Sequence, residues 1–303
     1  MTPHPVVLAT PLAGFTALQD LDLDSGDYGM LLLLETGLPA SLTRLHLGQW
    51  LDLDASLDVM QQMSRLPRLR ELSLRFAPYS AGDYEPLASL PELTALSLDL
   101  CQEIPGCLAQ LRLRSLELVG TPFEGEDAPD DVAAQLAAAI APLQSLTHLS
   151  LHPTAGINAP PGPVCASAAA LSSLQSFAWL GGDPHAADPL PAGAWLASLR
   201  ELVLPVRIAA SSGGVLLTAQ RLERLALDWQ DGHEQLHIQV LRWAPHHPRL
   251  STVAACLDSP VVVEEARHCE HARPSLKVVP NQGLLPSMST PVSGSPSPDE
   301  LVF

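Results

Sequence analysis

The sequence predicts an α/β solenoid, a horseshoe in which about eleven irregular repeats each add one parallel strand to a concave sheet, with helices and loops on the convex side. Two observations lead to this prediction. The pattern Leu-x-x-Leu-x-Leu returns along most of the chain at intervals of 20 to 33 residues, and leucine supplies 57 of the 303 residues. Because aromatic residues make up only 4% of the chain, leucine must fill the interior.

Each copy of the pattern predicts one strand. Its last two leucines alternate with polar residues, which is the period of a strand that is buried on one face. The first leucine, and an apolar residue three positions before it such as Phe15 or Leu143, should turn inward at a corner. One repeat cannot bury its apolar side alone, so neighbouring repeats must stack. The expected strands centre on Leu21, Leu45, Leu72, Leu96, Leu116, Leu149, Phe177, Leu202, Leu225, Val253 and Leu276.

The segments between the strands return across the convex side, and several of them predict helices. Residues 129–140 give the clearest helix, with a proline and two acidic residues at the start and an apolar row at every fourth position. Residues 57–63, 232–243 and 260–271 show weaker versions of the same pattern. Residues 154–163 contain three prolines and predict a loop.

The repeated pattern resembles that of the leucine-rich-repeat family, and the resemblance covers about residues 12–280. It is closest to the irregular, ribonuclease-inhibitor-like repeats of F-box/LRR adaptors and of plant and green-algal proteins. The asparagine that the family carries three positions after the last leucine is missing from every copy except the last, where Asn281 matches. The resemblance therefore implies the solenoid, with irregular turns and variable loops.

The chain divides into three parts. Residues 1–14 form an N-terminal lead-in, and residues 15–280 carry the leucine-rich repeats. Residues 281–303 are rich in serine and proline with few residues that a core would bury, which predicts a disordered tail.

Composition and charge exclude several classes of function. A net charge of −17 argues against nucleic-acid binding, which needs a basic surface. Lys277 is the single lysine and no glycine-rich phosphate loop precedes it, so no nucleotide or other cofactor is expected. Five cysteines, an odd number, do not predict a disulfide framework. No apolar run is long enough for a membrane span and no signal peptide is evident, so we expect a cytoplasmic protein; the family resemblance adds a weak hint of cytoskeletal or axonemal association.

One motif carries possible metal chemistry. Residues 233–237 spell His-Glu-x-x-His, the zinc-binding helix of many peptidases. The extended version of that motif needs glycine and histidine where this chain has Val240 and Trp243. We therefore expect a chance match on a solvated helix, no metal and no enzymatic activity. An opportunistic zinc or nickel site remains an alternative, with the candidate ligands His233, His237, His268 and His271.

The outward positions of the strands predict a binding surface on the concave face. Early copies carry charged residues there, such as Asp20 and Arg44, whereas late copies carry alanine, valine, leucine and tryptophan. Exposed apolar residues around an aromatic anchor are typical of protein interfaces. We expect an unknown protein partner to bind at Leu180, Val203, Val206, Trp229 and Leu257.

The sequence leaves other interpretations open. C-terminal loops could cover the apolar patch, and the acidic N-terminal half, with 20 acidic residues and 7 arginines in residues 1–140, could steer a basic partner. The favoured function is a non-catalytic protein-interaction module. The alternatives are a metal-dependent hydrolase that uses residues 233–237, and a fragment of a ubiquitin-ligase substrate receptor that lacks its F-box.

Overall fold

The computed structural model describes residues 12–23, 37–48, 56–75, 81–99, 104–120, 129–152, 162–180, 189–228 and 234–281. These residues form eleven short strands, most of which coincide with the expected positions. The strands are β1 (Asp20–Leu23), β2 (Arg44–Leu47), β3 (Glu71–Leu74), β4 (Ala95–Asp99), β5 (Ser115–Val119), β6 (His148–His152), β7 (Ser176–Trp179), β8 (Glu201–Pro205), β9 (Arg224–Asp228), β10 (Thr252–Ala255) and β11 (Lys277–Pro280).

The strands form one parallel sheet in chain order, from β1 to β11. Equivalent leucines pair across neighbouring strands; Leu96, for example, lies opposite Leu116, as the repeat predicts. The last copy differs, because Val278 rather than Leu276 lies opposite Val253. Leu276 is buried directly before β11 and acts as the corner leucine, one residue nearer to its strand than in the preceding copy.

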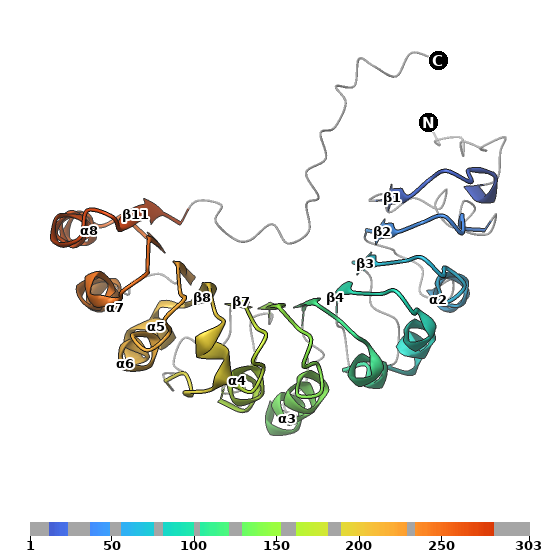
Figure 1. Cartoon of the computed structure of the whole chain (residues 1–303), viewed down its shortest axis with the longest axis horizontal. Coiled ribbons are helices and arrows are strands. Elements are labelled where there is room, and N and C mark those ends of the chain that lie inside the picture. Colours follow the sequence, from blue (N-terminus) through green and yellow to red (C-terminus); the bar gives the residue numbers. More distant parts are fainter. Residues whose placement is uncertain are drawn as a thin grey trace, which may run out of the picture.

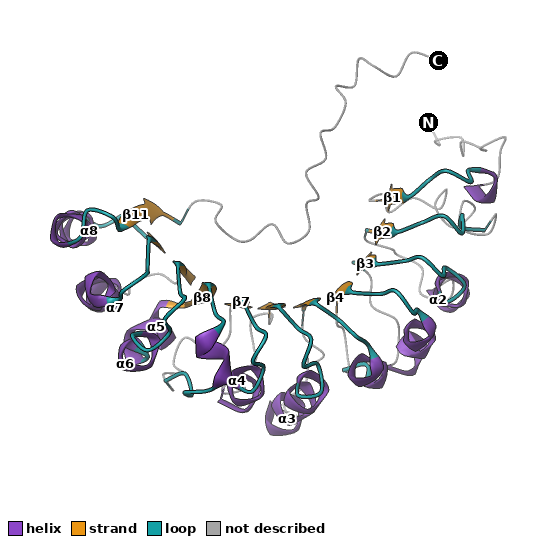
Figure 2. Cartoon of the chain, in the orientation of Figure 1, coloured by secondary structure: helices purple, strands orange, loops and turns teal. Residues whose placement is uncertain are grey.

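Helices line the outer arc and strands the inner arc of a curved solenoid (Figures 1 and 2). The helices expected at residues 57–63, 129–140, 232–243 and 260–271 are present; residues 232 and 233 lie outside the described residues, and the described part of the third helix is Glu234–Trp243. The loop expected at residues 154–163 lies mostly outside the described residues, but residues 162 and 163 already belong to a helix. The α-helices are α2 (Ser56–Met63), α3 (Pro129–Ile140), α4 (Gly162–Ala169), α5 (Val206–Ser211), α6 (Gly213–Leu216), α7 (Glu234–Trp243) and α8 (Pro260–Ala272), and the 3₁₀ turns are η1 (Leu12–Gly14), η2 (Ala81–Ser89), η3 (Gly106–Gln110), η4 (Ala194–Ala197) and η5 (Ala244–His246).

The core lies between the sheet and the convex helices. In β1–β10 the fourth and sixth pattern positions point into it, as Leu45 and Leu47 do in β2. The expected corner residues are buried as well, including Leu143, but Phe15 is 48% exposed. Phe15 belongs to the first copy, which has no earlier repeat among the described residues to stack against it. Within the described ranges, no helix combines the length and apolar character that crossing a membrane requires.

Hydroxyl groups link neighbouring repeats just before the strands begin. Ser145 Oγ donates a hydrogen bond to the carbonyl oxygen of Leu113, and Ser198 Oγ donates to that of Leu174. Both serines directly precede a first-position leucine, and both acceptors are the first-position leucine of the preceding repeat. A second set of hydroxyls stands one residue after that leucine and also bonds to the preceding repeat: Thr43, Thr94, Thr147 and Ser251.

Candidate functional site

One row of side chains crosses the whole concave face. It consists of the residue between the two core positions of each strand, and the strand register places each of these residues opposite the next. The row is polar over β1–β6 and apolar over β7–β11, and we call these parts the polar half and the apolar half. From β1 to β11 it reads Asp22, His46, Ser73, Ser97, Glu117, Ser150, Ala178, Val203, Ala226, Ala254 and Val279.

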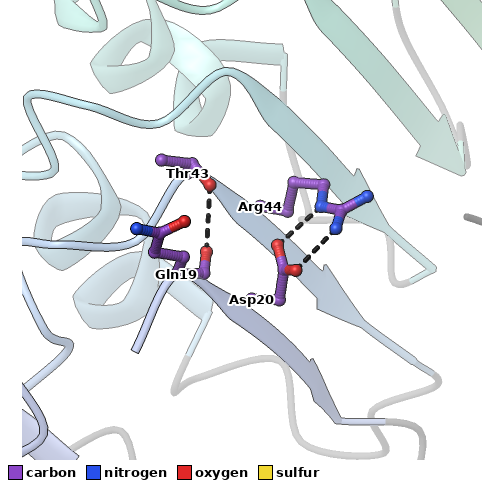
Figure 3. Close-up of polar contacts among 4 residues, drawn as sticks. All are labelled: Gln19, Asp20, Thr43 and Arg44. Atoms are coloured by element: carbon purple, nitrogen blue, oxygen red, sulfur yellow. Dashed lines mark hydrogen bonds and ion pairs between the residues drawn. The ribbon is translucent and has the colours of Figure 1, made fainter. Parts of the chain in front are cut away.

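An exposed ion pair stands at the β1 end of the polar half (Figure 3). Arg44 Nε donates a hydrogen bond of 2.5 Å to Asp20 Oδ1, and Arg44 Nη2 donates one of 2.5 Å to Asp20 Oδ2. Thr43 Oγ1 donates to the carbonyl oxygen of Gln19 at 3.2 Å. The hydrogen bonds from Arg44 lower the pKa of Asp20, with burial opposing this weakly. Because both side chains face solvent, the pair adds little stability but holds two charges in fixed positions on the face.

A buried polar network occupies the centre of the polar half. Glu117 is only 7% exposed although it points to the concave face. Its Oε2 atom accepts a hydrogen bond of 2.7 Å from Ser97 Oγ and lies 3.6 Å from Arg75 Nη2. Its Oε1 atom lies 3.4 Å from His152 Nε2, and the same nitrogen is 2.7 Å from Ser150 Oγ. The network therefore joins four neighbouring repeats: its members lie on β4, β5 and β6, and Arg75 directly follows β3.

The network contains a serine, a histidine and a carboxylate, but their arrangement differs from a nucleophilic triad. A triad needs the serine on one imidazole nitrogen and the carboxylate on the other, so that the histidine can pass a proton between them. Here Ser150 and Glu117 both approach Nε2 of His152. Ser150 is also buried, at 1% exposure, so a substrate has little access to its hydroxyl. The geometry suits recognition better than acyl transfer.

More negative than positive groups act on His152 among the described residues. Burial lowers the pKa of His152 and Arg75 lowers it further, while Glu117 and Asp228 oppose this change. The imidazole is therefore neutral at neutral pH. Asp99, at the end of β4, is half-buried; burial raises its pKa, and Arg75 partly offsets that effect. This region thus involves three carboxylates, those of Glu117, Asp228 and Asp99. Arg75 is the one guanidinium among the described groups that act on His152 and Asp99.

The apolar half is more buried than the sequence predicts. Ala178, Leu180 and Val203 form a small cluster with Ala226 that is separate from the core, and Leu180 and Val203 are 9% and 5% exposed. Their side chains stand close together because the neighbouring strands are in register and every member is small or medium-sized.

The remaining residues of the predicted binding surface have three different positions. Val206 is not on the concave face: it is 1% exposed and belongs to the core, because β8 ends at Pro205 and α5 begins at Val206. Leu257 is half-buried and packs against the same core. Trp229, the expected anchor, lies outside the described residues. The sequence therefore misplaced Val206, while the binding role of the other four residues stays a prediction.

The structure does not gather the candidate metal ligands. His237 is buried in α7, His268 lies on the exposed side of α8 with Nε2 3.5 Å from Glu264 Oε1, and His271 is exposed. His233 is outside the described residues. Within the described ranges, no three histidine, cysteine or acidic side chains lie close enough together to hold a metal ion.

Three of the described cysteines also lack the properties of soft ligands or nucleophiles. The four described cysteines are free, and burial raises the pKa of Cys107 and of Cys165 to about 12 and that of Cys269 to about 11. These three side chains remain protonated thiols at neutral pH, whereas the thiolate is the form that binds metals and attacks substrates.

The central network is the feature that the sequence analysis missed. Its members follow a common rule, since Ser97, Glu117 and Ser150 occupy the same pattern position in β4, β5 and β6. Arg75 and His152 stand two positions further along their own copies. Aligning the copies by their leucines reveals this grouping, but the burial of Glu117 became visible only in the structure.

The eleven stacked repeats define the chain as an α/β solenoid of leucine-rich repeats. One solved structure similar to it is described as "Crystal structure of TLR13-ssRNA13 complex", with 18% sequence identity and a TM-score of 0.37. The match covers 81% of this chain and 40% of that one, so the chain spans less than half the length of that protein. No family model and no curated protein matches the sequence.

Proposed function

We propose that the chain is a non-catalytic binding module that holds a protein partner on its concave face. The observation that supports this best is the contrast within the row that crosses the sheet. Ser97 and Glu117 in the polar half occupy positions equivalent to Ala178 and Val203 in the apolar half. Because Ala178 and Val203 are almost fully buried, this contrast is a change of surface chemistry along the face rather than a large exposed apolar patch.

The proposed contact surface centres on Trp229, with Leu180, Val203 and Leu257 around it. Val203 and Leu180 contribute a shallow floor because each leaves little area exposed. A tryptophan among apolar residues in the sequence has the composition of an interface anchor, and truncating an anchor commonly costs about 2 kcal/mol or more of binding free energy.

Nothing in the geometry favours the two alternatives. Hydrolysis at residues 233–237 requires two histidines free to bind a metal, and His237 is buried in α7. The ubiquitin-ligase fragment remains a prediction that no contact in the structure supports. A cytoplasmic location belongs to the proposal as well, supported by the odd number of cysteines and by the four free thiols among the described residues.

Comparative capture with matched variants tests the proposal. Wild type, Trp229→Ala and Val261→Ala are immobilised, and the proteins retained from a cell extract are quantified together with the melting temperature of each variant. Val261 is the control because it is apolar, 52% exposed and located on the convex helix α8. We expect a partner that binds wild type and Val261→Ala equally, and Trp229→Ala about 30-fold more weakly at an unchanged melting temperature. Equal capture by Trp229→Ala, or loss with Val261→Ala, overturns the proposal.

A further inference from the structure

Resting on the concave-face binding proposed above, we propose that the polar half of that face is the docking site for a basic segment of the partner, and that Glu117 accepts an arginine side chain of that segment. The site lies over β3–β6, between the β1 limb and the middle of the arc (Figure 1). It is distinct from the apolar surface around Trp229, so the two surfaces together would recognise a partner that carries basic and bulky apolar residues side by side.

The first argument is the unused hydrogen-bonding capacity of Glu117. A carboxylate offers about four acceptor positions. Ser97 Oγ occupies one of them at 2.7 Å, whereas Arg75 Nη2 stands at 3.6 Å, an ion-pair distance, and the neutral imidazole of His152 stands at 3.4 Å, beyond the usual hydrogen-bond distance. Both carboxylate oxygens therefore retain acceptor capacity, on a side chain that is held in place by its neighbours.

The second argument is the charge balance of the same region. Glu117 on β5 is buried and Asp99 at the end of β4 is half-buried in this region, and Arg75 is the guanidinium that acts on both His152 and Asp99. Removing carboxylates from water is costly unless cations compensate them. A cation supplied by the partner therefore gains more here than at an exposed carboxylate, because the water has already been displaced.

The third argument concerns the surrounding face and favours arginine over lysine. Towards β1 the surface continues with the exposed carboxylates of Asp20, Asp22 and Glu71. Among the described residues of β1–β3, Arg44 carries the one guanidinium that balances them. A basic segment that lies across the strands meets acidic groups along its length. At Glu117 two parallel hydrogen bonds are possible, and the planar guanidinium of arginine matches that geometry while the lysine ammonium does not.

Selection of short random-sequence peptides on the immobilised full chain tests the proposal, at about 0.15 M salt so that long-range attraction is screened. The selected peptides are then titrated by calorimetry into wild type, Glu117→Gln and the control Glu264→Gln. Both variants remove one negative charge, but Glu264 lies on the convex helix α8 with 57% of its side chain exposed. The amide that Glu117→Gln introduces is isosteric with the carboxylate and keeps an acceptor for Ser97, and melting curves verify the fold.

We expect selected peptides rich in arginine that bind Glu117→Gln about tenfold more weakly than wild type and Glu264→Gln within about twofold of wild type. A second variant, Asp99→Asn, should weaken the same peptides, and Trp229→Ala is titrated in the same way. Peptides without basic residues, equal losses in Glu117→Gln and Glu264→Gln, or no selected binder overturn this inference. If the peptides depend on Trp229 but not on Glu117, concave-face binding stands and the basic docking site fails. If they depend on neither, both proposals fail.

Discussion

Glycine at position 193 allows two neighbouring repeats to approach each other closely. A Cβ atom at Gly193 would lie 2.4 Å from the carbonyl oxygen of Ala169 in α4, a backbone atom that cannot move without shifting the helix end. We therefore expect Gly193→Ala to lower the free energy of unfolding by about 1–3 kcal/mol. Chemical denaturation of the purified variant measures this change.

Gly214 provides the matched control for that substitution. It lies inside α6, and a Cβ atom there would meet nothing within 4 Å. Alanine has a higher helix propensity than glycine, so Gly214→Ala should raise the free energy of unfolding by about 0.5–1 kcal/mol. Equal effects of the two substitutions would show that the contact between Gly193 and Ala169 is wrongly placed.

His247 makes the stability of the later repeats depend on pH. It is fully buried, with Nε2 2.9 Å from the carbonyl oxygen of Ala219, and Nδ1 accepts a hydrogen bond from the Leu250 amide. This pattern requires a neutral imidazole, and burial lowers the pKa of His247 below its ordinary value of 6.5. When pH falls below 6.5, the unfolded chain therefore binds a proton that the folded chain resists.

The expected result is a melting temperature that falls as pH decreases from 6.5. His148 and His152 contribute in the same direction, because burial lowers their pKa values too. His247→Asn should reduce the slope of melting temperature against pH below 6.5, while His268→Asn on the exposed side of α8 should leave it unchanged. The same slope in His247→Asn and wild type would assign the pH dependence to other groups.

Among the secondary-structure elements, strand positions and helix positions should differ in their tolerance of a buried charge. Leu149 is fully buried in the middle of β6 between two neighbouring strands, whereas Leu236 on α7 is half-buried at the edge of the core. We expect Leu149→Asp to cost about 4 kcal/mol or more and Leu236→Asp about 1–2 kcal/mol, because only the first places a carboxylate inside the stack. Thermal melting of the two variants compares them, and similar melting temperatures would contradict the assigned register.

Across the solenoid as a whole, each repeat contacts its neighbours, so the last repeat should stabilise the ones before it. Residues 282–303 are composed mostly of serine, proline and other residues that a core does not bury. Deleting them should change the free energy of unfolding by less than about 0.5 kcal/mol. Deleting residues 260–303 also removes α8 and β11, whose buried residues include Val262, Cys269 and Leu276, and should lower the melting temperature clearly. If the shorter deletion destabilises the protein equally, the tail is part of the fold.

The architecture of the solenoid was predictable from the amino-acid sequence alone. The fixed spacing of the leucines within each copy predicted the number, order and centre of the strands. Ten of the eleven centres are correct because every copy repeats the same burial requirement. The last centre was wrong, since Leu276 satisfies the same requirement from a corner position. The helix at residues 129–140 was likewise predictable, because its start signals and apolar row are local.

The surface that the concave face presents depends instead on tertiary packing. Arg75, Glu117 and His152 are separated by loops of unequal length, so their meeting depends on the strand register and on how deeply each side chain sinks between its neighbours. Val206 shows the converse, because one strand ending at Pro205 moved it from the expected face into the core. Periodicity fixes which side of a strand is buried, but long-range packing fixes which outward residues remain accessible and which charges face each other.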